Sequence, residues 1–179
     1  KEERTFSAAD RIVAEVKNRT QAAGKIILFG HSAGGQFVHR WALLGGKKNV
    51  DVIAVANSGW FTMPDRDIDY PYGIKNVGIT DEELGEAFAK PVILFMGEKD
   101  VERKPPFRDT PAADAQGMNR MERCTNYFRQ CKAKAEELRV PFRWKLETVE
   151  GAAHQGVKMA EGAAAYIFGK SSEDGNRRV

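Results

Sequence analysis

Apolar residues in this chain follow two different spacings that alternate from one end to the other. Short apolar runs, or segments that alternate apolar with polar, predict β-strands over residues 26–29, 50–56, 91–96 and 142–149. The last of these alternates, which favours a strand nearer the sheet edge. Apolar residues at helical spacing predict helices over 5–21, 36–44, 80–89, about 113–138 and 157–168. This strand–helix alternation predicts an α/β fold: a mostly parallel sheet with flanking helices.

The first apolar run ends in a turn rich in glycine, Gly30-His31-Ser32-Ala33-Gly34-Gly35. The G-x-S-x-G pattern between a strand and a helix is that of a nucleophile elbow, a sharp turn that exposes a serine Oγ. Glycines at 30 and 34 carry no Cβ, so strand and helix can approach each other there. The Ala33 N–H, at the helix start, is the predicted oxyanion donor. A glycine-rich turn with a chance serine is the alternative.

A serine nucleophile needs a base, and the chain has three histidines. His31 is expected to point away from Ser32, because it is the neighbouring residue in a tight turn. His39 lies two turns along the following helix, too far to reach back, and is expected to be a packed or surface residue. His154 lies in a loop after the last strand, from which a ring can reach over the sheet. We therefore predict His154 as the base.

The base needs an orienting carboxylate. Asp100 follows the third strand by a short turn, at the sheet edge where ligands gather in parallel α/β proteins. It is the predicted acid, with Glu98, Asp109 and Asp114 as competitors. The chain order is then nucleophile, acid, base.

With these residues assembled, the chain resembles the α/β-hydrolase superfamily, in which the three roles follow in this order. The resemblance rests on the elbow, the turn at 97–100 and the loop at 151–154, and runs to Phe168. The esterase, depolymerase and dienelactone-hydrolase-like branches are the most similar. The resemblance implies a hydrolase that cleaves esters, small or polymeric, through an acyl-enzyme. An amidase or peptidase of the same fold and a non-catalytic binding protein are the alternatives.

The chain also departs from that family, whose sheet usually has eight strands with the elbow after the fifth. Here a single predicted helix precedes the elbow. Residues 1–179 are therefore expected to form the later portion of one α/β-hydrolase domain, with 169–179 a polar tail. The early strands and the loop that carries the second oxyanion donor are expected to lie outside this chain. A separate or cleaved N-terminal polypeptide is the hypothesis for that part.

Residues 57–79 form a long irregular segment, and a loop of this length is often functional. Its four aromatic residues and His31 are the candidate substrate-binding residues: Trp60, Phe61, Tyr70 and Tyr72. Packing of these rings within the loop is an equally weighted alternative. Arg120 and Arg123 are candidates to meet a substrate carboxylate, although a solvated helix face is more typical of such residues.

Composition narrows the function classes further. The net charge of +3 and scattered basic residues do not indicate a nucleic-acid partner, and no apolar run approaches the length of a membrane span. No metal-binding cluster or phosphate loop is visible, so no cofactor is expected. Cys124 and Cys131 lie about 10 Å apart along a predicted helix, too far to bridge, and are expected to be free or packed thiols. The sequence shows no signal peptide, and the compartment is not predicted.

Overall fold

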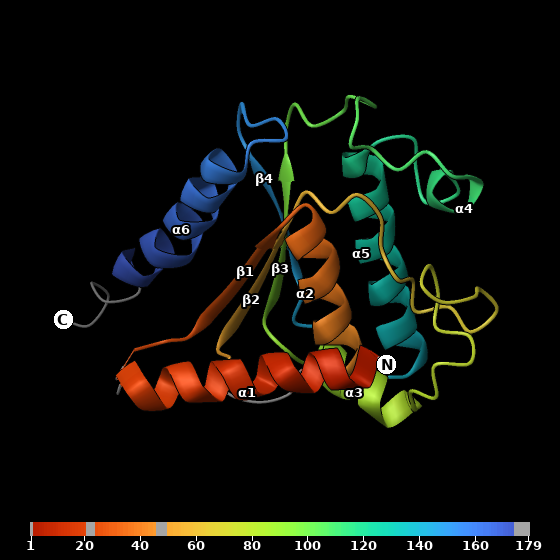
Figure 1. The fold of residues 1–179 in the computed structure, drawn as a ribbon, viewed down its shortest axis with the longest axis horizontal. Coiled ribbons are helices and arrows are strands. Elements are labelled where there is room, and N and C mark those ends of the chain that lie inside the picture. The colour runs from red at the N-terminus through yellow and green to blue at the C-terminus, as the bar shows by residue number, and fades with distance from the viewer. Residues whose placement is uncertain (1, 21–23, 46–49, 174–179) are drawn as a thin grey trace.

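The computed structural model describes residues 2–20, 24–45 and 50–173 (Figure 1). Over these residues the sheet has four strands: β1 (Ile27–His31), β2 (Val52–Ala56), β3 (Val92–Gly97) and β4 (Lys145–Val149). They lie in the order β1-β2-β3-β4, and every pairing is parallel. The predicted α/β class and parallel sheet are confirmed.

Six helices accompany this sheet in the described residues: α1 (Glu2–Thr20), α2 (Ala33–Leu44), α3 (Asp81–Phe88), α4 (Pro111–Asp114), α5 (Arg120–Glu137) and α6 (Gly156–Glu173). Figure 1 shows α6 on one side of the sheet and α2 and α5 on the other. Covering helices on both faces explain why β3 is buried along its whole length.

The two faces of the sheet build two separate cores, because successive strand residues point to opposite faces. In β2, Ile53 and Val55 join the larger core with α2, α3 and α5. Ala54 and Ala56 face the other way and join a smaller core with Met159 of α6.

The strand register brings the carboxyl ends of the strands close to one level. His31 at the end of β1 pairs with Ala56 at the end of β2, which pairs in turn with Phe95 of β3. Gly97 at the end of β3 pairs with Val149 at the end of β4. The segments that leave these four strands therefore start from a common edge.

The long helix predicted over 113–138 is wrong as a single element. It divides into α4 and α5, with Gly117 between them. Gly117 has a φ of +145°, a backbone conformation that is strained for residues other than glycine. Asn119 then caps α5 by accepting a hydrogen bond from the Glu122 N–H at 2.9 Å.

The chain end also differs from expectation. α6 continues to Glu173, so residues 169–173 of the expected polar tail are helical, while 174–179 lie outside the described residues. The helix predicted at 80–89 appears as α3, opened by a reciprocal capping box between Thr80 and Glu83.

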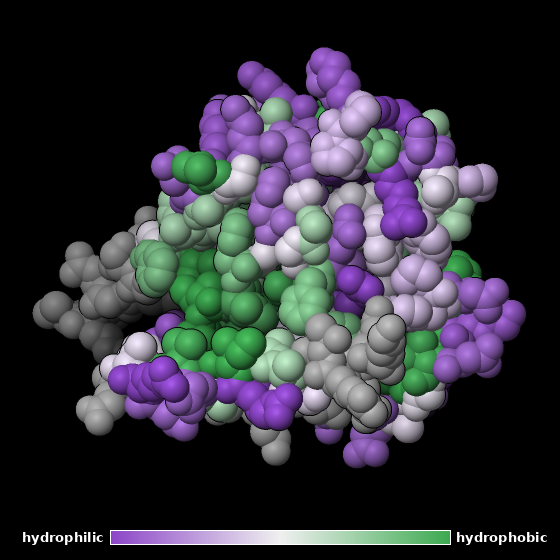
Figure 2. Space-filling view, viewed as in Figure 1, coloured by the Kyte–Doolittle hydropathy of each residue, from purple (hydrophilic) through white to green (hydrophobic). Residues whose placement is uncertain are grey.

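Apolar side chains gather over the area where Figure 1 draws α1 and β1 (Figure 2). Ile12 and Val16 of α1 are both more than half exposed. β1 is an edge strand of the described sheet, and edge strands present unpaired backbone groups. Over the residues described, no helix has the length and apolar character needed to cross a membrane.

Candidate active site

Ser32 occupies the turn between β1 and α2 with a φ of 56° and a ψ of −116°. Positive φ is a strained conformation for a residue other than glycine, and such strain gathers at functional sites. The Ser32 N–H donates to the Ala56 carbonyl of β2 at 2.9 Å, which ties the turn to the neighbouring strand. Ala33 is the first residue of α2, so its N–H has no partner within the helix.

The close approach of strand and helix at this turn requires glycine at positions 30 and 35. A Cβ on Gly30 would lie 2.7 Å from Val38 Cγ2, and one on Gly35 would lie 2.6 Å from Ser58 Oγ. A Cβ on Gly34 would meet nothing within 4 Å. The expectation that Gly34 is needed for space is therefore wrong.

Ser32, His154 and Asp100 form a continuous hydrogen-bonded chain. His154 Nε2 lies 3.0 Å from Ser32 Oγ, and His154 Nδ1 lies 2.7 Å from Asp100 Oδ2. An ionised carboxylate only accepts, so Nδ1 carries the proton and Nε2 is free to accept from the serine hydroxyl. Asp100 is 3% exposed, whereas the His154 side chain is 25% exposed. The structure thus brings the three predicted residues together, each just after a strand.

The competitors for the carboxylate role have other positions. Glu98 accepts a hydrogen bond from the Gly151 N–H at 2.7 Å, so it holds the backbone of the loop that leads to His154. Asp114 pairs with Arg103 and Arg123. Asp109 lies on the exposed surface.

Arg120 contacts the Asp100 carboxylate at the oxygen that His154 does not use, and the sequence did not predict this contact. Its Nη1 donates to Asp100 Oδ1 at 3.0 Å, and both side chains are at most 5% exposed. The guanidinium also lies 5.0 Å from the centre of the Phe107 ring. The expected solvated helix face is wrong here, because the chain between β3 and α5 folds over these residues.

Arg123 is also buried and does not face solvent. Its guanidinium donates to the carbonyls of Gly59, Arg108 and Gly117, and it pairs with Asp114. It therefore joins the segment after β2 to the segment after β3. No local sequence signal marks either arginine as buried, because their partners lie in distant loops.

Asn57 is a second residue that sequence reasoning missed. It directly follows β2 and has a φ of 46°, which asparagine tolerates better than most residues. Its Oδ1 accepts from the Gly97 N–H at 2.8 Å, and its Nδ2 donates to the Ala153 carbonyl at 3.1 Å. Asn57 thus links the ends of β2 and β3 to the residue before His154. The signal available was an asparagine at the end of a buried strand.

His31 does not point away from the site. Its ring lies against that of His154, with centroids 4.7 Å apart. Burial, followed by the neighbouring His154, lowers the pKa of His31. Its Nε2 is buried without a hydrogen-bond partner among the described residues.

His39 is a packed residue, which is one of the two alternatives that the sequence left open. Its Nε2 accepts from the Thr62 N–H at 3.0 Å, so Nδ1 carries the proton and donates to the Gly35 carbonyl at 3.0 Å. Complete burial lowers the pKa of His39 to about 3. The ring therefore stays neutral and joins α2 to the segment after β2.

Phe61 is a core residue, so the candidate role in substrate binding is wrong for this ring and the packing alternative holds. It is fully buried and stacks on Tyr127, with ring centroids 4.5 Å apart. Gln116 hydrogen-bonds both its N–H and its carbonyl.

The other aromatic residues of the loop contact one another and two arginines. Trp60 is 5% exposed and lies beside Tyr72, with the guanidinium groups of Arg40 and Arg108 at 5.2 and 5.8 Å from its ring. Tyr70 accepts a hydrogen bond from Arg40. These contacts match packing within the loop, the alternative that the sequence left open.

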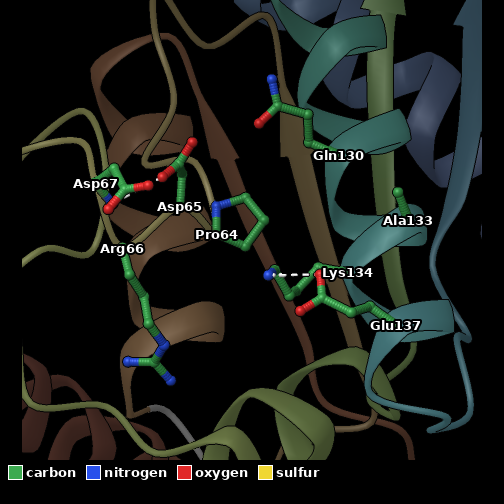
Figure 3. Close-up of a pocket in the computed structure, with 8 residues that line it drawn as sticks. All are labelled: Pro64, Asp65, Arg66, Asp67, Gln130, Ala133, Lys134 and Glu137. Carbon is green, nitrogen blue, oxygen red and sulfur yellow. Dashed lines mark hydrogen bonds and ion pairs between the residues drawn. The ribbon is translucent and has the colours of Figure 1, made fainter.

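A groove lies between the loop after β2 and α5 (Figure 3). It is lined by Pro64, Asp65, Arg66, Asp67, Gln130, Ala133, Lys134 and Glu137. Lys134 is paired with Glu137, and Arg66 with Asp81. The groove contains no member of the hydrogen-bonded chain, so it is not the candidate active site.

Comparison with solved structures shows two close neighbours. Poly(aspartic acid) hydrolase-1 from Sphingomonas sp. KT-1 is 32% identical over 91% of this chain, with a TM-score of 0.84. LpqC, a poly(3-hydroxybutyrate) depolymerase from Bordetella parapertussis, is 32% identical over 92%, also with a TM-score of 0.84. This chain spans 62% and 57% of their respective lengths.

A Thermus thermophilus protein, 16% identical with a TM-score of 0.51, shares the fold at a greater distance. Neither the models of known families nor the curated proteins yield a match. The matches to the two close neighbours nevertheless cover nine-tenths of this chain, and one neighbour is named as a hydrolase and the other as a depolymerase. Together with the parallel sheet and the segments that the sequence matched, they show that this chain belongs to the α/β-hydrolase superfamily.

Proposed function

We propose that this chain carries the catalytic centre of a serine hydrolase that cleaves carboxylic ester bonds. The observation that carries the proposal is the hydrogen-bonded chain from Ser32 through His154 to Asp100. Ser32 lies in a strained turn at a helix N-terminus, where a nucleophile is exposed and developing negative charge is favoured.

In the acylation step, His154 Nε2 takes the hydroxyl proton while Ser32 Oγ attacks the ester carbonyl carbon. The carbonyl oxygen becomes an oxyanion, which the Ala33 N–H and the positive end of α2 stabilise. When the tetrahedral intermediate collapses, His154 gives the proton to the leaving alcohol and the acyl group remains on Ser32. Asp100 keeps the imidazole oriented and stabilises its charged form.

In the deacylation step, water takes the place of the alcohol. His154 removes a proton from the water, which attacks the acyl carbon. The second tetrahedral intermediate collapses with return of the proton to Ser32 Oγ, and a carboxylic acid is released.

The second oxyanion donor, in this proposal, comes from a segment outside these 179 residues, on a longer chain or a separate N-terminal polypeptide. The neighbours support it, because more than a third of each has no counterpart here. β1 is an edge strand of the described sheet, and its free edge is where added strands would extend the sheet. One missing donor typically costs about 10²–10³ in rate, so the added segment is expected to restore that factor.

Amide hydrolysis is the second candidate, because one close neighbour is named for poly(aspartic acid) and the other for a polyester. Esters are favoured here, since an alcohol leaves more readily than an amine. A matched ester and amide of the same acyl group, assayed side by side, distinguish the two.

The first experiment is labelling with a fluorophosphonate probe, which reacts with activated serines. We expect label on the wild type and none on Ser32→Ala. Ser58→Ala is the matched control, because Ser58 Oγ is buried near the same turn without a hydrogen-bond partner in the described part of the chain. That variant should label like the wild type.

Equal labelling of the wild type and Ser32→Ala would contradict the proposal. Absence of label on all three proteins, with the N-terminal segment present, would also contradict it and indicate a binding protein on the hydrolase fold.

A further inference from the structure

We propose that Arg120 is a positioning residue of this centre, which holds the Asp100 carboxylate in the orientation that His154 requires. The inference rests on the proposed function of Ser32, His154 and Asp100. It concerns the side of Asp100 that faces away from the histidine.

The two oxygens of Asp100 have separate partners. Oδ2 accepts from His154 at 2.7 Å, and Oδ1 accepts from Arg120 at 3.0 Å. With a single partner, a carboxylate can rotate about its Cβ–Cγ bond and leave the imidazole. Two hydrogen bonds in different directions fix the carboxylate plane, so the Oδ1 contact determines where Oδ2 lies.

Arg120 is held for this contact by its own surroundings. It is the first residue of α5, directly after the cap Asn119, and its guanidinium lies over Phe107 at 5.0 Å. It is 5% exposed, and its Nε is buried without a partner in the described residues. Asp100 is the one hydrogen-bond partner of this guanidinium within the described chain.

Arg123 lies on the same helix as Arg120, and its contacts show how an arginine that only supports the structure differs from one that positions a carboxylate. Arg123 distributes its donors over three backbone carbonyls and Asp114, as expected of an arginine that joins loops. Within the part of the chain that the structure describes, Arg120 directs one donor at Asp100, and its Nε has no partner. A buried cation with a single partner contributes little to general cohesion, because its desolvation offsets the attraction.

The charged and titratable groups around Asp100 come from three elements. His31 comes from β1, His154 from the loop after β4, and Arg120 from α5. Of these, Arg120 is the cation in contact with Asp100. Its removal strengthens the negative charge that His154 experiences, so the acid side of the pH–rate profile is expected to move to higher pH.

The test is a double-mutant cycle on kcat/KM for an ester, in the full chain with its N-terminal segment. Arg120→Met is expected to lower kcat/KM by about 10²-fold through misplacement of the carboxylate. Asp100→Asn is expected to lower it by about 10⁴-fold. The double variant should equal Asp100→Asn, because a positioning residue has no effect once its target is gone.

A merely structural arginine would reduce the rate in both backgrounds. The proposal is therefore overturned if Arg120→Met matches the wild type, or if the double variant is slower than Asp100→Asn by a further 10²-fold. Arg120→Met leaves the buried Asp100 carboxylate without its cation, and this variant could fail to fold. The comparison of Asp100→Asn with the double variant then tests the positioning role, since neither protein contains the Asp100 carboxylate.

Two further variants refine the cycle. Arg120→Lys keeps a cation near Asp100, so it should recover both the rate and the acid limb of the profile. Arg129→Met removes an exposed cation from the same helix and should change neither.

Proton NMR of the His154 Nδ1–H gives a readout that does not depend on hydrolysis. This proton, hydrogen-bonded to Asp100, should give a low-field signal in the wild type that Arg120→Met shifts and Arg120→Lys retains. If the wild type cleaves no ester, the proposed function fails, while this signal still reports on Arg120. An unchanged signal in Arg120→Met would overturn the positioning role.

Discussion

Gly30 and Gly34 belong to the same turn, yet their surroundings leave different amounts of space for a side chain. A Cβ at 30 would meet the backbone of Gly34 and the side chain of Val38, both parts of α2 that cannot move without displacing the helix. A Cβ at 34 would point into open space. The pattern G-x-S-x-G therefore contains one glycine needed for space and one that is not.

Gly30→Ala is expected to destabilise the protein by about 1–3 kcal/mol, the usual range for overpacking, and to weaken probe labelling of Ser32. Gly34→Ala is the matched control and should be as stable as the wild type, because alanine is favoured over glycine in a helix. Urea unfolding and fluorophosphonate labelling measure the two effects. Equal losses in both variants would show that the turn does not depend on the contact at Gly30.

Helix α2 and the segment after β2 are joined through His39, which is neutral and completely buried. The pKa of His39 is about 3 in the folded state, against an ordinary value of 6.5. Because the unfolded chain binds a proton there more readily, acid favours unfolding. The stabilisation is complete above pH 6.5 and is lost as the pH falls from 6.5 toward 3.

We expect His39 to lower the free energy of unfolding by about 2 kcal/mol between pH 7 and pH 5, from 1.36 kcal/mol per pH unit. His39→Gln is the control, since its side-chain oxygen can still accept from Thr62 but does not titrate. Urea unfolding at both pH values gives the difference between the two proteins. The same pH dependence in His39→Gln would contradict the assignment.

The strands and most helices were predictable because each has its own local pattern, and Ser32, Asp100 and His154 each follow a strand. Contacts between distant loops were not predictable in this way. Asn57 and Arg120 carry no pattern that identifies Gly97 or Asp100 as a partner. For Phe61 the sequence left pocket lining and packing open, because a loop aromatic that stacks on a distant Tyr127 looks the same in sequence as one that faces a substrate.

Both cysteines are free thiols in the larger core, so their reactivity measures whether that core is closed in the whole molecule. Burial raises the pKa of the Cys124 and Cys131 thiols. Thiol reagents attack the thiolate, so both should be unreactive until the core opens.

A thiol-specific chromogenic reagent at pH 8 should find no reactive cysteine in the native protein and two in strong denaturant. Arg129→Cys, which adds a thiol at an exposed position on α5, should give one fast-reacting group. Rapid reaction of either natural cysteine in the native protein would instead show that α5 separates from the sheet on its own.

The members of the hydrogen-bonded chain come from three turns at the strand ends, while residues 60–79 contribute none of them. Asn57 and the Gly59 carbonyl, which do support neighbouring turns, come before that interval. Phe61, Met63 and Ile74 of this interval belong to the larger core. Exchange of the interval for a loop of another enzyme would therefore disturb folding, even though it removes no member of the hydrogen-bonded chain.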